Sequence, residues 1–249
     1  MPRIKQSIEQ LFAYKSALVG LTIIFTLVMI STYTILAIPY SRATELWRVG
    51  EQHWLENPRN AMPSWINIFS FKKLPETIVL DTEKPKSGVS KAIIPVAEKF
   101  SKIKVGFSFN YEYDDFPSEL NLFFKSNFNV SAPQLTIHWI KPNGEDIILN
   151  TILISREDRY YISSDEKLAK SLRSMISAKI NGTISDNVPV IILLFAQEDD
   201  TICNADTARV MKGEYRLWID GIIFETNIDL DVKLVVYGKV YGWAGTDHL

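Results

Sequence analysis

Histidine, acidic and cysteine side chains are the residues of this sequence that could carry chemistry, and we first asked whether their spacing fits a known site. The histidines, His53, His138 and His248, lie far apart, and none belongs to an H-E-x-x-H metal motif. The sequence also lacks a nucleophile elbow, a P-loop and a glycine-rich dinucleotide loop. Cys203 is the only cysteine, which excludes an intrachain disulfide and a cysteine-based zinc site. We therefore expect no enzyme, and no cofactor or metal bound by this chain.

The acidic residues form two groups. Glu198, Asp199, Asp200 and Asp206 could ligate calcium, but they lack the D-x-[DN]-x-[DN]-G spacing of a calcium loop, so we expect a solvated loop. Asp114-Asp115 is followed by Phe116-Pro117, a pattern typical of a turn. Assigning a pair of acids to glycoside hydrolysis would require knowing which of them face each other across a cleft.

A long apolar stretch precedes all of these residues. ALVGLTIIFTLVMISTYTILAI, residues 17–38, contains no charged residue and would span roughly 33 Å as a helix, close to the thickness of a bilayer's hydrocarbon core. We predict a transmembrane helix over residues 16–39. The alternative is a cleaved signal peptide, but the run is longer than the usual apolar region and no clean small-x-small cleavage site follows it.

The segment ahead of this helix is expected to lie in the cytoplasm. Over residues 1–15 the apolar positions have the spacing of a short amphipathic helix, which could lie on the inner membrane surface; a frayed terminus is the alternative. Its basic residues outnumber its single acid, Glu9, which favours an inside location, although arginines also follow the span. The sequons at Asn129 and Asn181 are candidate glycosylation acceptors and suit an outside location for the downstream region.

Residues 40–74 form an irregular juxtamembrane linker rich in tryptophan and proline. Its amphipathic aromatic residues suit a membrane interface and could equally anchor the linker on a neighbouring protein; they are Tyr40, Trp47, Trp54 and Trp65.

Residues 75–243 have the residue composition and alternation of a β domain. Runs rich in β-branched and aromatic residues predict strands over residues 102–113, 120–126, 134–140, 146–154, 188–195, 215–224 and 229–243. Lys141-Pro-Asn-Gly144 predicts a hairpin turn in which the Asn-Gly pair takes positive φ values. One helix is predicted at 164–180, with a capping box from Ser163 and Glu166 and an apolar stripe of Leu168, Leu172, Met175 and Ile176. The fold class is therefore mainly β, a β-sandwich with one packed helix after the membrane helix.

Three short segments resemble one membrane-protein family. YKSALVGLTIIFTLVMISTYTILAIPYS, residues 14–41, resembles the first membrane helix of the C-type permeases of dipeptide and oligopeptide ABC importers. NPRNAMPSW, residues 57–65, looks like the extracellular segment that follows it, and GTDHL, residues 245–249, looks like the start of the family motif G-T-D-x-L-G-R-D. That motif leads into the second membrane helix, so we expect residues 244–249 to begin a permease transmembrane domain.

The resemblance implies a function and a set of partners. The chain would be the N-terminal part of a multi-pass permease that imports peptides or oligosaccharides, with residues 40–243 extracellular and the β domain inserted into the first extracellular loop. The expected partners are a second permease subunit, ABC ATPase subunits that would bind ATP, an extracellular substrate-binding protein and membrane lipid. A net charge of −2 gives no reason to expect nucleic acid. No substrate-binding residue can be carried over, because the family's pathway would lie beyond Leu249.

Two other classes of protein combine an apolar helix with a β domain. A single-pass surface protein with a ligand-binding β-sandwich would have the same helix and domain. A pilin-like subunit needs a processing site just before the helix and usually a glutamate near its start, and the sequence from Lys15 offers neither.

Overall fold

The computed structural model describes residues 14–37, 40–41, 44, 57–97, 100–128, 131–224 and 229–246. The chain divides into two compact units, Met1–Leu55 and Glu56–Leu249, which we describe separately. The predicted amphipathic helix over residues 1–15 falls almost entirely outside the described residues, as do Trp47, Trp54 and the residues from Asp247 onward.

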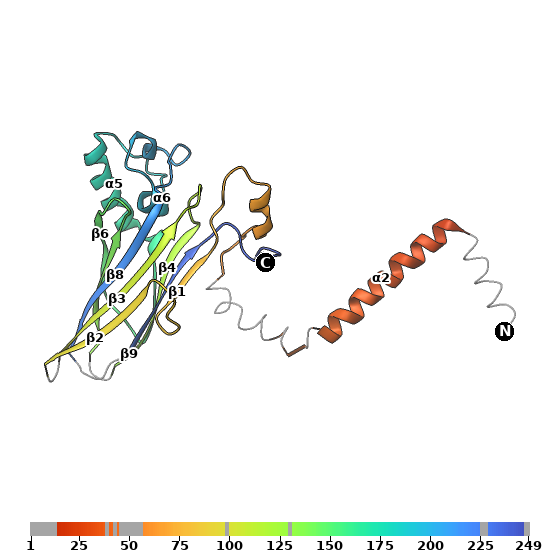
Figure 1. Ribbon diagram of the computed structural model, residues 1–249, viewed down its shortest axis with the longest axis horizontal. Helices are drawn as coiled ribbons and strands as arrows, with labels where there is room; N and C mark the ends of the chain where they lie inside the picture. The colour runs from red at the N-terminus through yellow and green to blue at the C-terminus, as the bar shows by residue number, and fades with distance from the viewer. Residues whose placement is uncertain are drawn as a thin grey trace. The chain divides into compact units, whose positions relative to one another are not determined.

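The first unit contains helix α2 (Lys15–Ala37), which has no buried residue (Figure 1). Its length and composition allow it to cross a membrane, and it agrees closely with the predicted span. Its threonine hydroxyls donate to carbonyls one turn earlier, for example from Thr22 to Leu18 O at 2.9 Å and from Thr32 to Val28 O at 2.8 Å. Hydroxyls satisfied within the helix can enter hydrocarbon without losing hydrogen bonds.

The second unit is a sandwich of two antiparallel sheets, as the sequence predicted (Figure 1). One sheet has the order β1 (Ile78–Asp81), β9 (Asp229–Tyr237), β4 (Glu119–Asn127), β7 (Glu157–Tyr161). The other has the order β2 (Val89–Ala97), β3 (Phe100–Tyr111), β8 (Gly213–Ile223), β5 (Gln134–Ile140), β6 (Asp146–Leu153). Strands β1, β2 and β7 were not predicted.

Alternation of side chains along the strands builds the core. In β3 the side chains of Ile103, Val105 and Phe107 are buried, while Lys102 before them and Lys104 after Ile103 are exposed. The facing sheet contributes an equivalent set from β4 and β9: Leu120, Leu122, Phe124, Leu230, Val232, Leu234 and Val236. A period of two with one buried face is what packs two sheets together.

Helix α5 (Glu166–Ile180) lies where the sequence placed a helix, and Leu168, Leu172 and Ile176 are buried as predicted. The predicted cap was wrong. Asp165, not Ser163, accepts from the Lys167 and Leu168 N–H groups at 3.0 Å, because Ser163 Oγ is already bonded to the Leu120 N–H of strand β4.

The predicted strand at 188–195 was also wrong. Val190–Phe195 forms a short helix, α6, in which all six residues are buried. Its last carbonyls accept hydrogen bonds from the Trp139 indole at 3.3 Å and the Tyr215 hydroxyl at 3.2 Å. A continuous apolar run has no period that separates a buried strand from a buried helix. At the end of a sandwich a helix is favoured, because it satisfies most of its backbone groups internally.

Two smaller predictions need correction. In the hairpin turn only Gly144 has a positive φ, of 86°, and the Gly144 N–H donates to Lys141 O at 2.9 Å. The turn thus closes over Pro142 and Asn143, because proline fixes a negative φ at the first central position. Strand β9 ends at Tyr237 rather than continuing to residue 243, since the chain leaves the ladder at Gly238, where a Cβ would lie 2.4 Å from Pro75 O.

Candidate functional site

The residues on either side of the sandwich pair with each other, and we call this paired region the junction (residues 57–74 and 238–246). The Met62 N–H donates to Lys239 O, the Tyr241 N–H to Met62 O and the Ser64 N–H to Gly242 O, each at 2.9 Å. Figure 1 shows the segment that follows β9 beside the 3₁₀ helix η1 (Ser64–Ile68). The chain therefore enters and leaves the sandwich at one place.

Gly245 and Thr246 form the outer part of this pairing. The Thr246 N–H donates to Ala61 O at 2.8 Å, while its hydroxyl accepts from the Ala61 N–H at 3.1 Å and donates to Pro58 O. Gly245 has a φ of 77°, and a Cβ there would lie 2.5 Å from Ala61 O. Only glycine fits this close approach of two backbones without strain.

Within the junction, residues 67–74 form a closed loop, which we call the junction loop. The Asn67 side chain acts like a strand partner for Leu74, accepting from its N–H at 2.9 Å and donating to its carbonyl at 3.0 Å. The backbone of Lys73 is bonded to Asp114 through both its N–H and its carbonyl, each at 2.9 Å. The loop is thus fixed at its end and attached to the sandwich.

The junction loop displays apolar side chains to the outside. Ile68 and Phe69 are each 78% exposed, and Phe71 is fully exposed. Beside them, Trp65 packs edge-on against Phe69 with ring centroids 6.3 Å apart, and its indole donates to the carbonyl of Trp243 at 3.1 Å. Large apolar residues exposed together on one fixed loop make it a candidate interaction surface.

Asp114 and Asp115 lie in the connection between β3 and β4, as the turn prediction required, and both support the junction. Asp114 pairs with Lys212, and Asp115 pairs with Lys239 at 2.7 Å. The Lys212 ammonium and the Lys73 N–H hold the pKa of the Asp114 carboxyl below its ordinary value. These acids therefore anchor the junction to the sandwich.

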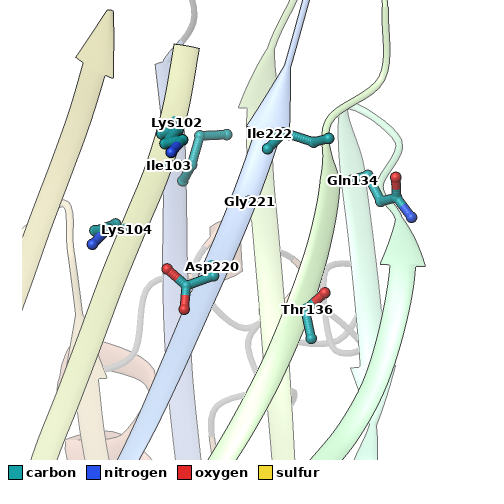
Figure 2. Close-up of a pocket in the computed structure, with 8 residues that line it drawn as sticks. All are labelled: Lys102, Ile103, Lys104, Gln134, Thr136, Asp220, Gly221 and Ile222. Carbon is teal, nitrogen blue, oxygen red and sulfur yellow. The ribbon is translucent and has the colours of Figure 1, made fainter. Parts of the chain in front are cut away.

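A groove of about 450 Å³ lies on the outer face of the five-stranded sheet, in the region drawn in Figure 2. Residues of three adjacent strands line it: Lys102, Ile103, Lys104, Gln134, Thr136, Asp220, Gly221 and Ile222. Across the sheet, Lys104 and Thr136 flank Asp220, whose carboxylate accepts from the Trp218 indole at 2.8 Å. Ammonium, carboxylate, amide and hydroxyl groups on one open surface could bind a polar ligand by hydrogen bonds.

The remaining acids and the described histidine have structural surroundings. His138 Nδ1 lies 3.1 Å from Asp146 Oδ1 on the neighbouring strand, while His53 and His248 lie outside the described residues. Asp199 accepts from the Thr201 N–H at 3.0 Å and so caps a short 3₁₀ helix, η3 (Asp200–Cys203). Among the described residues, no group of three His, Cys, Asp or Glu side chains could hold a metal ion.

Glu198 belongs to a network of four charges at the end of the sandwich where α5 and α6 lie. The Lys141 ammonium, whose side chain is buried, lies 2.7 Å from Glu198 and 4.0 Å from Glu145. Lys179 of α5 contacts both carboxylates. Burial alone would raise the pKa of Glu198, but its hydrogen bonds with Glu145, Lys141 and Lys179 outweigh burial and lower it to about 2. Burial and the neighbouring Glu198 raise the pKa of Glu145.

The second sequon lies on the surface. Asn181 is exposed and has a left-handed conformation, with φ 51°, at the C-terminal end of α5. Asn129, the other candidate acceptor, lies outside the described residues.

No protein-family model matches this chain, and no curated protein matches it either. A functional assignment therefore depends on the junction, the groove and the segments singled out in the sequence.

Proposed function

We propose that this chain is the N-terminal part of a permease subunit of an ABC importer, with the β-sandwich inserted into the first extracellular loop. The observation that carries the proposal is the contact between Thr246 and residues 58–61. In typical members of the family that the sequence resembles, the Pro-Ser-Trp segment and the Gly-Thr-Asp motif are close neighbours. Here the sandwich separates the two segments in sequence, yet they touch in space.

An insertion is tolerated when the ends of the inserted domain lie close together. The junction meets this condition, because three backbone hydrogen bonds join residues 62–64 to residues 239–242. A sandwich that starts and ends at one place would leave the backbone path of the first extracellular loop, into which it is inserted, nearly unchanged. The same geometry explains why family-like segments would survive on both sides of a domain that the family lacks.

In this proposal α2 crosses the membrane with its N-terminal end in the cytoplasm, and the sandwich stands outside the cell. A second permease subunit and two ATPase subunits complete the transporter, which imports peptides or oligosaccharides. The sandwich docks the extracellular substrate-binding protein or covers the pore mouth, and the groove on the five-stranded sheet is the surface offered for docking.

Reading the gene beyond the codon for Leu249 tests the assignment. The proposal expects Gly-Arg-Asp or a close variant, followed by another apolar span, because a transport pathway needs several membrane helices. An immediate stop codon would remove the permease proposal.

A deletion tests the role of the sandwich. A short linker in place of residues 78–237 keeps the residues of the junction and the membrane helix in the chain, so the subunit should still assemble with its ATPases but show reduced uptake. Unchanged uptake would remove the docking and covering roles while leaving the permease assignment in place.

One observation favours a second function, that of a single-pass surface protein that binds a ligand. The polar groove is formed by residues of three strands that belong to the sandwich alone, so it needs no transporter to be complete. This function predicts that the chain binds its ligand without ATPase subunits, whereas the permease proposal predicts that it copurifies with them.

A further inference from the structure

We propose that the junction loop inserts Ile68, Phe69 and Phe71 into the headgroup region of the phospholipid bilayer that α2 crosses. The proposal concerns the loop and the membrane helix only, and it holds whether the chain is a permease or a single-pass protein. It begins from apolar side chains that are exposed: Phe71 is fully exposed, and Ile68 and Phe69 are each 78% exposed.

Hydrogen bonds fix the loop in the conformation that exposes these apolar side chains. The Asn67 amide closes the loop on Leu74, and Asp114 holds the Lys73 backbone from the sandwich side. A loop that is already ordered loses little conformational entropy when it enters another phase. Three apolar side chains on a fixed loop therefore behave as a preformed insertion element.

The chemistry of the neighbouring residues fits a lipid surface better than an apolar protein groove. Lys72 follows the apolar residues and is exposed, so its ammonium could contact phosphate groups while the apolar side chains lie deeper. Trp65 and Trp243 flank the loop, and tryptophan is enriched at the level of the headgroups. Lysine, tryptophan and phenylalanine together are typical of interfacial membrane segments.

The covalent link to α2 keeps the junction loop near the bilayer. Residues 38–56 link Ala37, the last residue of α2, to the junction, and a fully extended segment of that length reaches roughly 70 Å. A tether of this length makes insertion an intramolecular event with a high effective concentration, so a loop with weak intrinsic affinity would still be inserted.

Depth measurements on the full chain in vesicles test the proposal. Cys203 is replaced by serine, a single cysteine is introduced as Phe69→Cys, and it is labelled with a nitrobenzoxadiazole fluorophore before reconstitution into phosphatidylcholine–phosphatidylglycerol vesicles. The matched control is Leu153→Cys, because Leu153 is also apolar and 68% exposed but lies on strand β6. Both positions are on the surface, so neither label should disturb folding, which near-ultraviolet circular dichroism checks.

The label at residue 69 should emit at shorter wavelength than the label at 153 and should be quenched by lipid-attached nitroxides. Replacing Lys72 by glutamine should lower the equilibrium constant for insertion about fivefold in anionic vesicles, while Lys84→Gln, a change at another exposed lysine, should not. Equal quenching at 69 and 153 would overturn the proposal. A blue shift at 69 without lipid quenching would also overturn it, since the loop would then be covered by protein.

Discussion

Replacing Lys141 by methionine should destabilise the sandwich far more than the same substitution at Lys212. Both ammoniums pair with a carboxylate, Lys141 with Glu198 at 2.7 Å and Lys212 with Asp114. They differ in burial, because the Lys141 side chain is 0% exposed and the Lys212 side chain is 50% exposed. The pair of substitutions therefore changes the same chemical group in two environments.

The expected magnitude follows from what each substitution leaves behind. Without Lys141, the carboxylates of Glu145 and Glu198 share only Lys179, and breaking a buried pair costs about 3–5 kcal/mol. An exposed pair contributes about 0–1 kcal/mol. For a unit of this size each kcal/mol lowers Tm by about 2–4 °C, so Lys141→Met should lower Tm by roughly 6–20 °C and Lys212→Met by less than about 4 °C.

The pH dependence gives a second readout of the same interaction. The pKa of Glu198 is about 2 in the folded protein against an ordinary value of 4.5, so the unfolded state binds the proton first as the pH falls. Stability from Glu198 is thus fully present above pH 4.5 and is lost as the pH falls toward 2. Glu145, whose pKa is raised, opposes part of this effect because its ionisation disfavours the folded state. In Lys141→Met the pKa of Glu198 is depressed less, so this variant loses less stability as the pH falls. The difference in Tm between the unmodified protein and Lys141→Met should therefore narrow below pH 4.5.

Thermal unfolding of the full chain in detergent, followed by near-ultraviolet circular dichroism, measures both effects. The aromatic cluster of Phe109, Tyr111, Trp139, Phe195 and Tyr215 lies inside the sandwich and reports on its tertiary packing. Equal losses of Tm for the two substitutions would refute the reasoning. So would a difference in Tm between the unmodified protein and Lys141→Met that stays constant down to pH 3.

Three further predictions concern the junction, the core and the topology. A chain of residues 75–246 should unfold about 10–20 °C below one of residues 57–246, because it lacks five backbone hydrogen bonds worth about 1 kcal/mol each, and equal Tm values would contradict this. Gly221→Ala should cost about 1–3 kcal/mol in urea unfolding, since its Cβ would lie 2.3 Å from a leucine methyl carbon, whereas Gly182→Ala, with no atom nearer than 3.4 Å, should cost clearly less. In a chain freed of its native cysteine, a cysteine at Leu153 should react with an impermeant maleimide on intact cells, and one ahead of the membrane helix should not; the reverse pattern would invert the proposed orientation.

The strands that the sequence predicted correctly are those whose burial alternates. In β3 and β8 every second residue over most of the length faces the core, so a period of two is visible in the sequence. Strand β2 was missed because it is an edge strand that contains Pro95 and pairs its Lys91 with Asp231 at 2.8 Å, which leaves little apolar pattern. Helix α6 was misassigned because all its residues are buried, and burial on every side removes the period.

The junction could be predicted only in part. Sequence resemblance drew attention to residues 57–65 and 245–249, but nothing in either segment indicates that Thr246 bonds to Pro58 and Ala61. Such a contact joins residues far apart in sequence. It depends on where β1 and β9 place the segments that precede and follow the sandwich. The groove could not be predicted either, because it is formed mainly by outward-facing residues of three strands whose order in the sheet, β3-β8-β5, does not follow the sequence.

The positions of the junction and the groove within the sandwich bear on how the two would be used. Strand β3 runs from Phe100 to Tyr111; its beginning lines the groove with Lys102 and Lys104, and the connection after its end carries Asp114, which holds the junction. From Lys104 to Tyr111 a strand advances about 23 Å. If the junction loop contacts the bilayer, the groove therefore lies on the part of the sandwich farther from the lipid, where a large soluble protein could reach it without meeting the membrane. Within the proposed function, this separation favours docking of a binding protein on the sheet over closure of the pore mouth by the same surface, and substitutions at Lys102 and Lys104 should then weaken binding of that protein without changing the lipid contact of the loop.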